Sequence, residues 1–188
     1  MITPPRLIPL LAQFDFALDR LVNRLDGLTD DEYFWEPVAG CWSVRPREHS
    51  QAGMPMESDG WVLEFDRPEP DPPPFTTIAW RVCHLALGMT MRADYTVGTK
   101  AMTRDDYEIA GNAVAGIAAL IASGAAWRAA VTSVRTDADL DQVGRSQHPW
   151  GLDTRLPFLD IVWWVNQEVL HHGGEIALLR DLYRAQPR

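Results

Sequence analysis

The sequence is short of positive charge. Its 188 residues include 17 lysines and arginines against 26 aspartates and glutamates, which gives a formal net charge of −9. Phosphate binding needs a basic face, so we expect no nucleic-acid partner. The same deficit disfavours adsorption to an anionic membrane surface. We therefore expect a small-molecule substrate rather than a charged polymer.

Cysteine is also scarce, and long apolar runs are missing. Cys41 and Cys83 are the two cysteines, and they do not form a close-spaced pair. This usage is typical of a reducing, cytoplasmic setting. Residues 1–11 hold prolines and no long apolar core, so we expect no signal peptide. No stretch comes close to the roughly 18 apolar residues of a membrane helix.

Several catalytic signatures are missing as well. The chain has no Walker loop, no Gly-x-Gly-x-x-Gly, no Gly-x-Ser-x-Gly and no Cys-x-x-Cys. Cys83 next to His84 could be a nucleophile with its base. Adjacent side chains on a helix diverge by about 100°, however, so this pair has poor geometry for catalysis.

Apolar residues at steps of three and four predict four long helices. The first carries a leucine-rich stripe over residues 7–25 and ends at Gly27. The others are expected over residues 77–97, 112–134 and 157–185. A short helix should follow Thr29, because Thr29 and Glu32 have the spacing of a capping box. The pattern predicts an all-α fold, a four-helix bundle that forms one domain over residues 1–188.

A long excursion separates the first two helices. Residues 36–75 are rich in proline and glycine, with two apolar segments, 41–44 and 61–65, that could pair as a short β-hairpin. Excursions of this length are usually functional or disordered. The tryptophans within it favour an ordered flap that lies over the bundle.

Glu168 and His172 are four residues apart on the last helix, on its apolar face. His84 lies on the apolar part of the second helix. A buried carboxylate and imidazole need a partner, and two histidines with one carboxylate suit a divalent transition metal. The alternatives are a hydrogen-bonded structural histidine at 84 and a salt bridge or rim position at 168.

The segment His171-His172-Gly173-Gly174-Glu175-Ile176 resembles the His-His-Arg-Gly-Gln-Ile signature of the DinB-like (YfiT-like) family. Residues 77–84 are similar to the stretch that carries the family's first histidine. The resemblance implies a four-helix bundle with a metal ligated by His84 and His172. The family's middle histidine corresponds to Glu168, which adds a negative charge to the site. The family's glutamine corresponds to Glu175, a general base, a partner of His172 or a surface residue.

The resemblance also implies a function. The family includes transferases and isomerases that use small thiols such as mycothiol or bacillithiol. The donor set in this chain suits zinc, nickel, iron or manganese, of which we favour zinc or nickel. A hydrolase that activates water at the metal belongs to the same class. The alternative is a non-catalytic, stress-associated bundle that binds a metal or a small ligand. A homodimer through helix faces is compatible with either.

Two tryptophans and two glycines complete the candidate site. Trp42 and Trp150, in the two long loops, are candidates for walls that bind the cofactor above the metal, together with Trp61 and His148. The alternative, which we favour for at least half of the tryptophans, is that they only anchor their loops. Glycines 173 and 174 are costly inside a helix, so either a neighbouring helix, a loop or the substrate approaches their backbone closely, or the helix breaks there.

Overall fold

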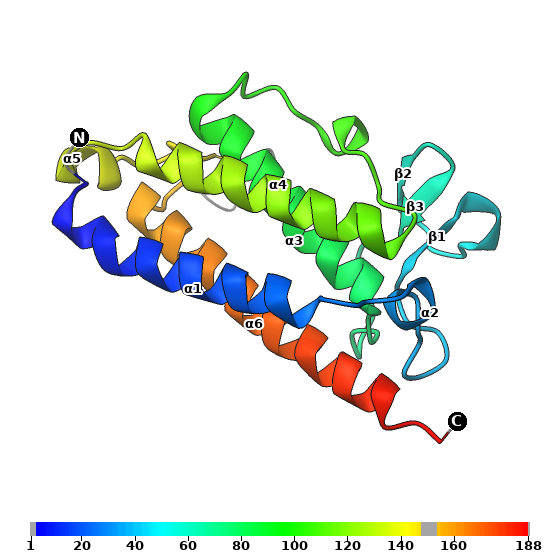
Figure 1. Cartoon of the computed structure of the whole chain (residues 1–188). Coiled ribbons are helices and arrows are strands. Elements are labelled where there is room, and N and C mark those ends of the chain that lie inside the picture. The colour runs from blue at the N-terminus through cyan, green and yellow to red at the C-terminus, as the bar shows by residue number, and fades with distance from the viewer. Residues whose placement is uncertain (1–2, 148–153, 188) are drawn as a thin grey trace.

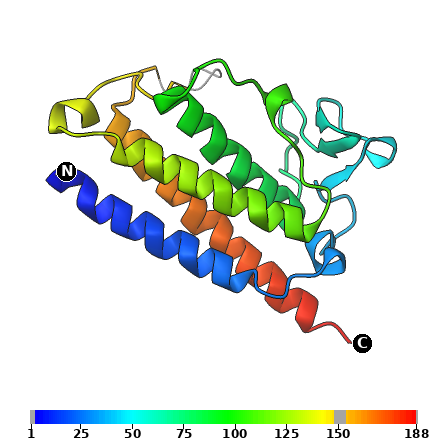
Figure 2. The ribbon, with the colours of Figure 1, turned by 45° about the horizontal axis from the view of Figure 1, so that its top comes forward.

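The computed structural model describes residues 3–147 and 154–187. It is a four-helix bundle with a flap at one end, as the pattern predicted (Figures 1 and 2). The long helices are α1 (Ile8–Arg24), α3 (Ile78–Val97), α4 (Ala113–Thr132) and α6 (Phe158–Arg184). The short helices are α2 (Asp30–Tyr33) and α5 (Asp137–Leu140), with 3-10 turns at Pro5–Leu7, Arg47–His49 and Arg104–Asp106.

Local side-chain chemistry determines where these helices begin and end. The hydroxyl of Thr77 accepts a hydrogen bond from the backbone N–H of Trp80 at the start of α3. The side-chain carbonyl oxygen of Asn112 accepts a hydrogen bond from the backbone N–H of Ala115 at the start of α4. Gly27, with φ of +68°, takes the left-handed conformation just beyond α1. The boundaries therefore match the predicted ones to within a few residues.

The four helices form two parallel pairs. α1 lies beside α6 and α3 beside α4, and the two pairs run in opposite directions (Figure 1). Residues 98–112 run back along the length of the bundle, so that α4 starts at the same end as α3. The flap lies at this end, where Trp42 forms a bridge with Thr76 just before α3.

The flap holds a three-stranded antiparallel sheet. Its strands are β1 (Val44–Pro46), β2 (Met56–Ser58) and β3 (Trp61–Leu63), with β3 in the centre. The expected strand at 61–65 is confirmed as β3. The one at 41–44 was misplaced, because Trp42 bonds to the chain before α3 and pairing with β3 starts at Val44. β2 was missed because it is short and carries little apolar pattern.

One expectation about membranes needs correction. Within the described residues, α4 is long and apolar enough, by length and composition, to cross a membrane. Residues 113–127 carry no charge, and their many alanines count toward the hydropathy. Leu120, Trp127 and Val131 pack into the bundle core, whereas Val114 and Ile121 are exposed. A core helix of a soluble protein meets the same criterion, so α4 is weak evidence for membrane insertion.

Candidate metal centre

Three side chains singled out from the sequence meet between α3 and α6. His84 comes from α3, and Glu168 and His172 come from one face of α6. Their potential ligand atoms all lie within 4.8 Å of one another. The structure thus brings together, from two helices far apart in sequence, the three donors proposed from the sequence.

One carboxylate oxygen is shared by the two imidazoles. Glu168 Oε2 lies 3.2 Å from His84 Nε2 and 3.3 Å from His172 Nε2. Metal–ligand bonds of about 2.0–2.2 Å in tetrahedral or octahedral geometry place neighbouring ligand atoms about 2.8–3.6 Å apart. Both spacings fall in this range. They also fit hydrogen bonds if each Nε2 carries a proton, so two protons or one cation can satisfy the same three atoms.

The carboxyl group of Glu168 is held in its charged form. Burial acts to raise its pKa, but the hydrogen bonds from His172 and His84 outweigh burial and lower the pKa to about 2. Glu168 is therefore ionised throughout the neutral range, as a metal ligand must be.

The three side chains are unequally covered. The side chain of His172 is 12% exposed, that of Glu168 23% and that of His84 36%. His84 therefore has the most contact with solvent of the three. Three protein ligands with an accessible side leave room for a further ligand, which is what a catalytic metal needs.

The other ring nitrogen of His172 has its own partners. Nδ1 lies 2.7 Å from Glu175 Oε2 and 3.1 Å from a guanidinium nitrogen of Arg81 on α3. Arg81 also forms an ion pair with Glu175. A carboxylate oxygen can only accept, so the contact to Glu175 fits a proton on Nδ1. With that proton in place, a cation bound at Nε2 would replace the hydrogen bond from Nε2 to Glu168. Carboxylate partners of this kind orient metal-binding histidines.

The substitution Glu175→Gln is therefore expected to weaken metal binding about 10- to 100-fold, because a neutral amide holds the Nδ1 proton less strongly. Competition with a chromophoric chelator measures the affinity. Asp181→Asn is the matched control, since Asp181 is on the same helix in an exposed ion pair with Arg24. Equal affinities for Glu175→Gln and the wild type would show that Glu175 does not orient His172.

The predicted aromatic walls fall in different places. Trp42 is buried and stacks on Trp80, which in turn stacks on His84, so Trp42 lies two rings away from the centre. Trp61 stacks on Phe34 and anchors the flap. Trp150 and His148 lie outside the described residues.

The expected helix end at the two glycines was wrong, and within the described residues no neighbouring helix or loop approaches their backbone closely. α6 continues through Gly173 and Gly174. A Cβ at Gly173 would make only ordinary contact with Leu21, at 3.9 Å, and one at Gly174 would meet nothing within 4 Å. The missing side chains instead open a groove of about 640 Å³ between α1 and α6. The side chain of His171 is 64% exposed, and its Nε2 lies 3.3 Å from Glu175 Oε1.

Neither cysteine has the surroundings of a nucleophile. Both thiols are buried, and burial raises the pKa of Cys83 to about 12. Burial also raises the pKa of Cys41, whose thiol donates to the carbonyl of Val38. The thiolate is the reactive form of cysteine, so the raised pKa argues against Cys83 as a nucleophile paired with His84, as the helix geometry also does.

Sequence reasoning missed Arg81. Its guanidinium joins α3 to Glu175 and His172, and its side chain is only 13% exposed. The available signal was an arginine three residues before His84, on the covered side of a helix. Arginine is rarely buried without a partner, so this position called for an acidic residue on another helix.

Comparison with known protein families gives a match. The family model of the DinB superfamily matches residues 13–176 of the chain. This range contains all three candidate ligands and the flap. No curated protein and no solved structure matches the chain.

Proposed function

Because the chain belongs to the DinB superfamily, we propose that it is a metal-dependent enzyme whose ion is held by His84, Glu168 and His172. The observation that carries the proposal is the sharing of Glu168 Oε2 by two Nε2 atoms at 3.2 and 3.3 Å. The accessible side near His84 supports catalysis over a purely structural metal.

The donor set suits zinc or nickel, since both accept imidazole and carboxylate ligands. Such an ion, when bound, supplies a Lewis acid that lowers the pKa of a coordinated thiol or water. Glu168 cancels one of the two positive charges of the ion, and Arg81 and Glu175 neutralise each other. One net positive charge remains, which matches a singly charged ligand such as a thiolate.

We therefore propose a transfer or isomerisation reaction that depends on a small thiol of the mycothiol or bacillithiol type. Glu175 is our candidate for proton handling: its Oε2 accepts from His172, and its Oε1 faces the exposed His171 at 3.3 Å. A proton taken at Oε1 could pass to solvent through His171. Hydrolysis at the same centre is the variant of this proposal.

A non-catalytic ligand-binding bundle is the second candidate. The groove of about 640 Å³ beside Gly173 and Gly174 favours it, because apolar ligands bind between helices in this way. In that case metal content and ligand binding would be unrelated.

Metal content tests the proposal. The protein, purified without a metal-binding tag, is expected to carry near-stoichiometric metal by plasma mass spectrometry. His172→Ala should reduce it to background, because it removes the best-covered ligand. His171→Ala, the adjacent exposed histidine, should leave it unchanged. Metal-loaded wild type is then assayed for consumption of a small thiol with an electrophilic acceptor.

Wild-type protein that stays free of metal after reconstitution would contradict the metal-enzyme proposal and leave the ligand-binding bundle. Equal metal content in the wild type, His172→Ala and His171→Ala would show that the metal is bound at a site that does not include His172.

A further inference from the structure

The ring of His84 is covered on one face by a tryptophan. The imidazole and the indole of Trp80 are stacked, with centroids 4.9 Å apart and planes 9° from parallel. The two residues are four apart on α3, so the helix itself places one ring over the other. Rotation of His84 away from Glu168 would break this stack.

Trp80 is in turn held by the flap. Its indole N–H donates to the backbone carbonyl of Glu64, at 2.8 Å. Trp42 stacks on Trp80, with centroids 6.1 Å apart. The backbone of Trp42 is bonded on both sides to the chain before α3, accepting from Thr77 and donating to Phe75. The flap therefore determines where the indole ring lies.

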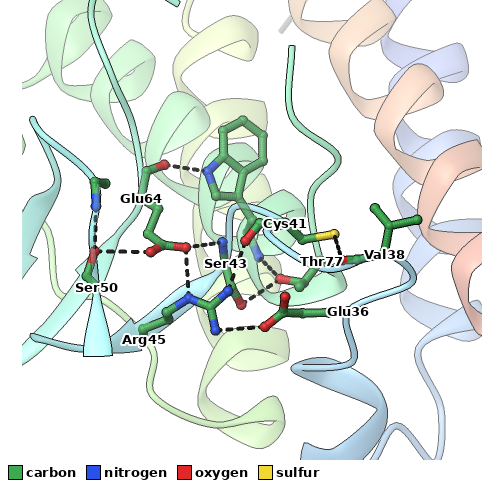
Figure 3. Close-up of polar contacts among 10 residues, drawn as sticks. Glu36, Val38, Cys41, Ser43, Arg45, Ser50, Glu64 and Thr77 are labelled. Carbon is green, nitrogen blue, oxygen red and sulfur yellow. Dashed lines mark hydrogen bonds and ion pairs between the residues drawn. The ribbon is translucent and has the colours of Figure 1, made fainter. Parts of the chain in front are cut away.

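The side-chain carboxylate of Glu64 is buried, and three hydrogen bonds fix its position (Figure 3). Its oxygens accept from the backbone N–H of Ser43, from Nε of Arg45 and from the hydroxyl of Ser50, at 2.9, 2.9 and 3.1 Å. The side chain of Glu64 is only 8% exposed. A buried ion pair contributes little net stability, but it can enforce one geometry.

The same network reaches the start of α3. The hydroxyl of Ser43 lies 2.9 Å from that of Thr77, the residue that caps the helix. Arg45 donates to the carbonyl of Cys41 and forms an ion pair with Glu36 at 2.9 Å. A chain of contacts thus runs from the flap to the ring of His84, none of them involving the ion itself.

We propose that the flap positions His84 as a metal ligand, through the chain Arg45–Glu64–Trp80–His84. This inference rests on the proposed metal centre. Trp80 is a positioning residue, and Glu64 acts through it.

A second effect reinforces the first. A cation bound at Nε2 makes the imidazole ring more positive, and the face of an indole attracts positive charge. The stack is therefore stronger with the ion bound. By linkage, metal binding should also stabilise the flap, and the Trp80 indole N–H should exchange more slowly with solvent when metal is added.

The test compares two glutamates of the flap. Glu64→Gln removes the charge that Arg45 holds, while Glu57→Gln, the control, removes the partner of Arg47 in an exposed pair. The probe is Co(II), with affinity measured by chelator competition and ligand geometry by the visible cobalt bands. Glu64→Gln is expected to lower the affinity about tenfold and to shift the bands, because the flap orients His84 indirectly. Glu57→Gln should stay within about twofold of the wild type.

Trp80→Phe is the second variant, because it keeps an aromatic ring over His84 and removes the N–H that bonds to Glu64, together with part of the stack on Trp42. Trp80→Phe is also expected to lower the Co(II) affinity and to shift the bands. If circular dichroism shows that Glu64→Gln does not fold, Trp80→Phe alone tests the positioning role. Wild-type affinity and bands in the folded variants would overturn the positioning role and leave the metal centre intact. Absence of Co(II) binding by the wild type would overturn the metal centre and the positioning role together.

Discussion

Glu168→Gln is expected to lower the affinity for a divalent transition ion by at least about a hundredfold, more than loss of an outer partner costs. The change removes the negatively charged ligand and leaves two imidazoles with a neutral amide. Glu168→His is the informative counterpart, because it restores a nitrogen ligand at this position. Its affinity should stay within about tenfold of the wild type. Chelator competition with Zn(II) and Ni(II) measures all three proteins.

Equal metal binding by Glu168→Gln and the wild type would show that Glu168 is only a hydrogen-bond partner of the two histidines.

The lowered pKa of Glu168 predicts how the stability of the metal-free protein depends on pH. Its folded-state pKa, about 2, lies below the ordinary 4.5, so the stability it contributes is present at neutral pH. That stability should be lost as the pH falls from about 4.5 toward 2. The stability difference between wild type and Glu168→Gln should narrow over the same window.

Arg180→Ala is expected to destabilise the fold by about 3–5 kcal/mol. Arg180 is fully buried and forms a two-point ion pair with Glu32, with nitrogen–oxygen distances of 2.6 and 3.0 Å. It also donates to the backbone carbonyls of Arg24 and Asp26, just after α1. Its loss would leave the buried carboxylate of Glu32 without its close cation and free the turn between α1 and α2. Urea unfolding followed by circular dichroism gives the free energy.

Arg128→Ala is the matched control. Arg128 on α4 also makes a two-point pair, with Asp15 on α1 at 2.7 and 2.9 Å, but both side chains are more than a third exposed. Its removal should cost about 0–1 kcal/mol. A similar loss of unfolding free energy in Arg180→Ala and Arg128→Ala would mean that burial does not determine how much these ion pairs contribute to stability. The contrast separates the loss of an arginine from the creation of an unpaired buried charge.

The four long helices were predictable because their signals are local. Apolar residues at three- and four-residue steps determine which face of a helix is buried, and Thr77 and Asn112 determine where α3 and α4 start. The Glu168–His172 pair belongs to the same class of signal, since a spacing of four residues on a helix fixes relative position without reference to the rest of the chain.

The tertiary structure decided what these residues meet. Only packing of α3 against α6 placed His84 next to Glu168 and set Arg81 against Glu175. The return of residues 98–112 along the bundle, and the bonds from the flap to Trp80, depend on contacts between segments far apart in the chain.

Gly173 and Gly174 show the same limit. Their cost to helix propensity was readable from the sequence, but whether a backbone, a side chain or open space faces them depends on where α1 lies. Local periodicity thus determined the helices and the spacing of two ligands. The partners of the third candidate ligand, His84, and the groups that orient all three ligands depend on long-range packing, which residue spacing does not encode.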